Sequence, residues 1–90
     1  MRHTIENEHL VVSIETLGAE VKSVVRKSDG KQLWWEGDKN YWNGSSPILF
    51  PACGGLWDGK YEWQGKTYNL PKHGFVKGME WDYLGETTYK

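Results

Sequence analysis

One histidine stands in a sequence context that could perform chemistry. The segment 70–77 reads Leu-Pro-Lys-His-Gly-Phe-Val-Lys, so His73 lies between two lysines and directly before Gly74. An imidazole ordinarily titrates at about pH 6.5, so it can donate or accept a proton near neutrality. A glycine beside it lets a ligand approach the backbone closely. These features favour a polyol ligand at His73, although a histidine that only stabilises a turn would also fit the pattern.

The other candidates for catalysis have weaker patterns. Cys53 lies in Ala-Cys-Gly-Gly with no activating base beside it, so a small buried or half-buried residue is expected there. His3 and His9 belong to a charged amino-terminal stretch and are expected at the solvated surface. Asp58 and Glu62 are nearby carboxylates, but a glycosidase needs its two carboxyls on opposite sides of a bond. A solvated turn explains them better.

Metal, nucleotide and polyanion binding are not expected. The spacing of His, Cys and carboxylate residues does not supply the three or four ligands that zinc or calcium requires, so no metal is predicted. No Gly-x-Gly-x-x-Gly or Walker pattern follows a strand and opens a helix, so no cofactor is predicted. Eleven basic and twelve acidic residues leave a net charge of -1. This balance gives no attraction to nucleic acid or to an anionic membrane.

The composition predicts a small cytoplasmic protein. Ninety residues suffice for one domain. The chain lacks an apolar run of the roughly 20 residues that span a bilayer, and its opening residues lack the apolar core of a signal peptide. Its single cysteine excludes an internal disulfide, which favours a reducing compartment.

Aromatic residues are unusually abundant, with six tryptophans, five tyrosines and two phenylalanines. Such rings can build a core, a partner surface or a platform on which sugars stack. Trp35, Trp42 and Trp57 are the candidates for stacking. The ordinary strand preference of aromatic residues is the competing explanation.

Alternating apolar and polar residues predict strands in the first third of the chain. The alternation runs over 10–15 and again over 21–26. Asp29-Gly30 then supplies a pair that tolerates positive φ in a tight turn, and it leads into 32–35. We therefore expect a β-hairpin here.

Further strands are expected in the rest of the chain, although no window has helical spacing. Residues 60–63 and 66–70 predict a second hairpin, and shorter strands are expected at 48–50, 79–84 and 87–89. The fold class is all-β, with about seven strands at the spacing of a sandwich. Exposed strand edges should favour self-association.

Four blocks in this order resemble the aldose 1-epimerase (galactose mutarotase-like) family and, within it, the LacX-like subgroup. The resemblance extends from about Thr4 to the last residue, and the ordered set is more specific than any single block. The blocks are Tyr41-Trp42-Asn43-Gly44, Ser46-Pro47-Ile48-Leu49-Phe50-Pro51, Asp58-Gly59-Lys60-Tyr61 and the segment 70–77.

The resemblance implies a large antiparallel β-sandwich, a supersandwich with little or no helix, of which residues 1–90 match the amino-terminal part of a single domain. Members interconvert the α and β anomers of free aldoses by acid–base catalysis. A carboxylate removes the anomeric hydroxyl proton while an imidazole protonates the ring oxygen. The ring opens, the C1–C2 bond rotates, and closure gives the other anomer. The ninety residues lack this base by the family pattern, so they are expected to be inactive alone.

The resemblance also assigns roles to residues. His73 matches a family histidine that contacts the sugar near its ring oxygen, which makes it the predicted catalytic residue. His73, Phe75, Lys77 and Trp57 are the predicted substrate-binding residues, for a hexose-like small sugar. Gly55 departs from the pattern, because many relatives carry an arginine close to this position, and its absence removes a bidentate donor. The alternative function is a non-catalytic carbohydrate-binding β-module.

Overall fold

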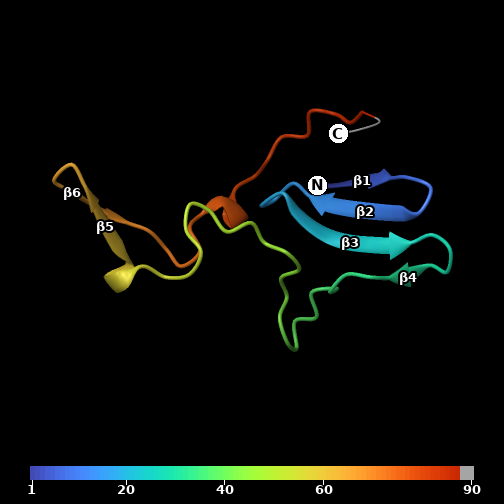
Figure 1. The fold of residues 1–90 in the computed structure, drawn as a ribbon, viewed down its shortest axis with the longest axis horizontal. Helices are drawn as coiled ribbons and strands as arrows, with labels where there is room; N and C mark the ends of the chain where they lie inside the picture. The colour runs from blue at the N-terminus through green and yellow to red at the C-terminus, as the bar shows by residue number, and fades with distance from the viewer. Residues whose placement is uncertain (88–90) are drawn as a thin grey trace.

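The chain folds as two antiparallel sheets joined by irregular segments. The computed structural model describes residues 1–87 and is drawn in Figure 1. The larger sheet has the strand order β1-β2-β3-β4, and the smaller sheet pairs β5 with β6. This arrangement confirms the expected all-β fold class. The strands are β1 (Arg2–Glu6), β2 (Leu10–Glu15), β3 (Glu20–Arg26), β4 (Lys31–Gln32), β5 (Lys60–Trp63) and β6 (Lys66–Asn69), and the short 3-10 helices are η1 (Trp57–Gly59) and η2 (Val76–Gly78).

Strand β2 organises the larger sheet because it pairs along its length with both neighbours. It opposes β3 on one side, with a register shift between Ser13 and Ile14, and β1 on the other. All of its residues are half-buried. The period-two patterns at 10–15 and 21–26 therefore predict two strands that the structure contains, although burial does not alternate from residue to residue along either of them.

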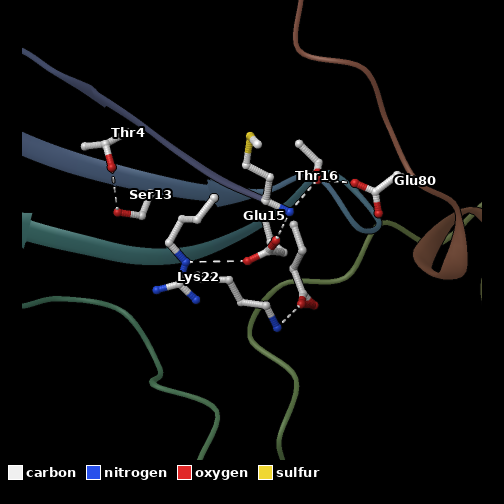
Figure 2. Close-up of polar contacts among 9 residues, drawn as sticks. Thr4, Ser13, Glu15, Thr16, Lys22 and Glu80 are labelled. Atoms are coloured by element: carbon white, nitrogen blue, oxygen red, sulfur yellow. Dashed lines mark hydrogen bonds and ion pairs between the residues drawn. The ribbon is translucent and has the colours of Figure 1, made fainter.

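Strand β1 corrects the expectation that the amino-terminal stretch is only solvated surface. Its residues are mostly polar, but the edge of β2 supplies backbone partners for all five of them. Thr4 Oγ1 and Ser13 Oγ lie 3.4 Å apart across this pair (Figure 2). His3 is half-buried and stacks on Tyr83 with ring centroids 3.8 Å apart. Pairing with a neighbouring strand outweighs the low apolar content of this segment.

Both predicted hairpins are present. The Gly30 amide donates to the Arg26 carbonyl at 2.8 Å and closes the turn between β3 and β4. Arg26 Nε donates to Asp29 Oδ1 at 3.0 Å, and this guanidinium lowers the pKa of the Asp29 carboxyl. In the turn between β5 and β6, Gln64 and Gly65 have φ values of 48° and 76°. Two successive positive φ values match the tight turns that suit the twist of a hairpin.

The expected strands at 32–35 and 48–50 are corrected by the structure. Only Gln32 of the first segment belongs to β4. The second segment has no strand, and a single parallel bridge joins Phe50 to Gly74. Apolar residues of high strand propensity do not extend a ladder where no second backbone runs beside them.

The expected strand at 79–84 is also corrected. Here one antiparallel bridge joins Glu80 to Leu17, and the segment has no strand beyond it. The predicted run 87–89 falls, apart from its first residue, outside the residues that the structure describes.

Much apolar surface is left uncovered by residues 1–87. Leu70 and Val76, exposed by 8% and 7%, are the buried hydrophobic residues of this part. The radius of gyration is 16.8 Å, whereas a compact domain of this length has about 12 Å. The accessible surface is 7375 Å², against roughly 5,400 Å² for a compact protein of this mass. Figure 1 shows the reason, because the β5–β6 hairpin projects away from the larger sheet.

Candidate functional site

His73 lies in the loop between β6 and η2, where a second loop holds it at two points. The His73 amide donates a hydrogen bond to the Gly54 carbonyl at 2.9 Å. The Gly54 amide donates in return to His73 Nδ1 at 2.8 Å. The first bond fixes the backbone and the second fixes the imidazole, so the position of the ring depends on the loop 50–55.

A second contact beside this pair explains why Gly74 follows the histidine. The Phe50 carbonyl accepts the amides of Phe75 at 3.0 Å and Val76 at 3.3 Å. A Cβ on Gly74 would overlap that carbonyl oxygen, which no side chain can tolerate. Gly74 therefore admits the backbone of Phe50, and this corrects the expectation that its missing side chain serves ligand approach.

His73 itself has a left-handed backbone with a φ of 66°. Histidine is among the residues enriched in this region, but the conformation still costs about 1–3 kcal/mol. His73 is the third residue of a turn that the Gly74 amide closes on the Pro71 carbonyl at 2.9 Å, a position that is left-handed in type II turns, and the hydrogen bonds to Gly54 also hold it there. A ring held in this way is preorganised for contact with a ligand.

The position next to this pair is open. Gly55 is exposed, and a Cβ placed on it would meet no atom within 4 Å. Its φ is not in the left-handed range, whereas that of Gly54 is 89°. A side chain at Gly55 would therefore extend into free space beside the Gly54–His73 pair.

The four predicted substrate-binding residues are only partly brought together. His73 is half-buried, and Phe75, two residues further, is 50% exposed. Lys77 is exposed in η2. Trp57 is 95% exposed in η1, and Figure 1 shows η1 beside β5, apart from η2. The described residues therefore place His73 and Phe75 in one loop but do not gather Trp57 with them.

The three tryptophans proposed to stack on a sugar do not form one platform. Trp35 Nε1 donates to the Trp42 carbonyl at 2.7 Å, so these two residues belong to one irregular segment. In Figure 1 that segment, which follows β4, lies apart from η1. All three rings are exposed, Trp35 by 43% and Trp42 by 51%. Cys53 is also exposed, which corrects the expectation that it is buried or half-buried.

A polar cluster not predicted from the sequence fastens the segment after η2 to the larger sheet. Thr16 Oγ1 hydrogen-bonds Glu80 and also accepts the Met1 amino group, which lies 2.7 Å from Glu15 (Figure 2). The Met1 amino group lowers the pKa of the Glu15 carboxyl. The Trp81 amide donates to the Thr16 carbonyl at 2.9 Å. No short motif signals this cluster, because its members come from opposite ends of the described chain.

Within residues 1–87, no group of three or more His, Cys, Asp or Glu side chains is placed to hold a metal ion. The same residues include no helix long and apolar enough to cross a membrane.

Comparison with known proteins gives one consistent family. The family model described as aldose 1-epimerase matches residues 1–89. The chromosomal protein LacX of Lactococcus lactis subsp. lactis is 40% identical, with the match covering 84% of this chain and 27% of LacX. The chain thus spans about a quarter of the length of the curated relatives that it matches.

Solved structures agree. A galactose mutarotase-like protein from Lactobacillus casei is 37% identical and superposes with a TM-score of 0.92, covering 97% of this chain and 30% of that one. A galactose mutarotase related enzyme from Lactobacillus acidophilus is 34% identical with a TM-score of 0.91, covering 97% and 29%. The arrangement of strands and loops described above therefore recurs in larger proteins.

Proposed function

This chain belongs to the aldose 1-epimerase family, and we propose that it is the amino-terminal part of a single β-sandwich domain that interconverts the α and β anomers of free aldoses. The observation that carries the proposal is the fixed ring of His73, whose Nδ1 accepts a hydrogen bond from the Gly54 amide at 2.8 Å, beside an open position at Gly55.

In the proposed reaction His73 contacts the sugar near its ring oxygen and polarises it. A carboxylate base must remove the proton of the anomeric hydroxyl so that the bond between C1 and the ring oxygen breaks. Rotation about C1–C2 and closure then give the other anomer. The resemblance to the family assigns this base to none of the ninety residues, so we expect them alone to leave anomerisation at the buffer rate.

The remaining assignments are part of the same proposal. Phe75 would provide an apolar surface beside the sugar, Lys77 a polar contact, and Trp57 a stacking ring. A free hexose is the proposed substrate. We also propose a cytoplasmic location, because a single cysteine suits a reducing compartment.

Proton NMR of freshly dissolved α-glucose or α-galactose tests the function. The sample is a chimera in which this chain replaces the matching part of the Lactobacillus casei protein. We expect His73→Ala to slow anomerisation by about 100-fold or more, the usual effect of one acid–base group. His9→Ala is the control, since His9 is exposed in the turn between β1 and β2. An unchanged rate in His73→Ala would eliminate the proposed role of His73.

A carbohydrate-binding module is the second candidate, favoured by the 95% exposure of Trp57. Exposed tryptophan rings are suited to stacking on sugar faces. Titration of sugars against tryptophan fluorescence, run beside the anomerisation assay, separates the two functions. Saturable binding to the chimera without acceleration of anomerisation would favour the module.

A further inference from the structure

The structure assigns to Gly54 the role of a positioning residue that keeps the proton of the neutral His73 ring on Nε2. The inference rests on the proposed function, because it specifies what His73 presents to a sugar. Gly54 acts through its backbone amide, so its contribution is invisible in any comparison of side chains.

The hydrogen bond between the Gly54 amide and the His73 ring has a fixed direction. A backbone amide can only donate. The Gly54 nitrogen lies 2.8 Å from His73 Nδ1, so Nδ1 must present a lone pair to it. A neutral imidazole then carries its single proton on Nε2. A proton on Nδ1 would point at the hydrogen of the Gly54 amide, and neither group could accept a hydrogen bond from the other.

The backbone around Gly54 holds this amide in place. The carbonyl of Gly54 accepts the His73 amide at 2.9 Å, so the two residues are bonded in both directions. Gly54 adopts a φ of 89°, which a residue with a side chain rarely does. The neighbouring bonds from Phe75 and Val76 to the Phe50 carbonyl hold the two loops together. The acceptor role of Nδ1 is thus built into the pairing of the loops.

The other ring nitrogen of His73, Nε2, takes no part in this hydrogen bond. Nε2 has no hydrogen-bond partner among the described residues, and these residues include no buried side-chain nitrogen without a partner. Nε2 of the half-buried His73 therefore reaches solvent, with a hydrogen to donate. Its natural partner is an oxygen lone pair, such as the ring oxygen of an aldose.

In the proposed reaction, polarisation of the ring oxygen and its protonation are then performed by different groups. A neutral imidazole can polarise an oxygen by donating a hydrogen bond without giving up its proton, as an active-site histidine does in triosephosphate isomerase. His73 held in this tautomer stabilises charge that develops on the ring oxygen. The proton that this oxygen gains as its bond to C1 breaks comes from a second, protonated imidazole, the acid that the family mechanism requires.

Nitrogen-15 NMR of the imidazole rings tests the inference without measuring activity. Long-range nitrogen–proton correlations are recorded on the ninety-residue chain and on the chimera, at about two pH units above the ordinary imidazole pKa. If the two samples show different tautomers of His73, the tautomer in the chimera is the one that tests the inference. We expect His73 to show the Nε2–H tautomer alone, whereas exposed His9 provides the internal reference for exchanging tautomers. An Nδ1–H tautomer, or a mixture like that of His9, would overturn the inference.

Two substitutions of His73 separate the two ring nitrogens. His73→Asn keeps an acceptor near the Nδ1 position and tolerates left-handed φ, whereas His73→Gln keeps a donor near the Nε2 position. We expect hydrogen exchange of the Gly54 amide to remain slow in His73→Asn and to accelerate about tenfold in His73→Gln, as for the loss of one hydrogen bond. Equal exchange in both variants would contradict the role of Gly54.

The outcomes also distinguish this inference from the proposed function. An Nε2–H tautomer in a chimera that leaves anomerisation unchanged would refute the mutarotase function and keep the positioning role. A rate that falls in His73→Ala, combined with an Nδ1–H tautomer, would support the function and refute the positioning role.

Discussion

The four-stranded sheet and the paired loops around His73 are held together by different means. In the sheet, repeated backbone hydrogen bonds join neighbouring strands in the order β1-β2-β3-β4, and all residues of β2 are half-buried. In the loops, the contact depends on a few individual bonds, chiefly those of Gly54 and of the Phe50 carbonyl. Losing one bond from a ladder leaves its neighbours in place, but losing one from the loops removes a large part of the contact.

This difference indicates where substitutions should matter. The sheet should tolerate exchange among apolar residues that keep its alternation. The loops should be sensitive at two glycines, because Gly74 leaves room for the Phe50 backbone and both Gly54 and Gly74 have left-handed φ values that side chains rarely adopt. Four predictions test this contrast, and unless stated otherwise each stability is measured by urea unfolding of the chimera.

The largest effect is expected for Gly74→Ala. The new Cβ would overlap the Phe50 carbonyl and the residue would keep a φ of 76°, so the free energy of unfolding should fall by roughly 2–5 kcal/mol. Gly78→Ala is the matched control, because a Cβ there meets no atom within 4 Å. Equal stability of the two variants would show that the loops do not approach as closely as the structure indicates.

Leu70→Ala should have the next largest effect. Leu70 is 8% exposed and ends the hairpin next to the His73 loop, so its truncation should lower the free energy of unfolding by about 2 kcal/mol, the lower end for a buried leucine. Leu84→Ala provides the comparison, since Leu84 is 95% exposed. An equally large loss in Leu84→Ala would mean that another part of the protein covers that residue.

The same substitution should have different effects at the adjacent residues Gly54 and Gly55. Gly54 has a φ of 89° and Gly55 is not left-handed, so Gly54→Ala should cost about 1 kcal/mol of unfolding free energy while Gly55→Ala changes it little. Gly55→Arg should be equally well tolerated, because the position opens into free space. A strong destabilisation by Gly55→Arg would show that this space is filled.

The smallest effect concerns the turn between β3 and β4. Because Arg26 lowers the pKa of Asp29 in the folded state, Asp29 contributes stability above its unfolded pKa and loses it as the pH falls through the folded value. We expect the hydrogen-exchange protection of the Gly30 amide to fall in the parent below about pH 4. In Asp29→Asn the protection should not fall further over this pH range, because the titrating carboxylate is gone. Glu62→Gln in β5 is the control and should keep the acid response of the parent. If Asp29→Asn responds to acid as the parent does, the response arises from other carboxylates.

Part of this architecture could be predicted from residue patterns. Alternation at 10–15 and 21–26 and turn pairs such as Asp29-Gly30 and Gln64-Gly65 determine β2, β3 and two hairpins, because strand period and turn chemistry are local properties. Strand β1 could not be predicted, since its pairing depends on the edge of β2. The segments 48–50 and 79–84 have strand-like composition but find only single bridges.

The amino-acid sequence by itself determined the all-β class, the family and the identity of His73 as the candidate group, because hydrophobic period, turn residues and ordered motifs are all readable along one chain. Only the tertiary structure decided which nitrogen of that ring is available, why a glycine must follow it, and which amide holds it. These properties depend on backbone atoms of residues 50–55 that approach across some 20 positions of sequence, and an approach of that kind leaves no local pattern.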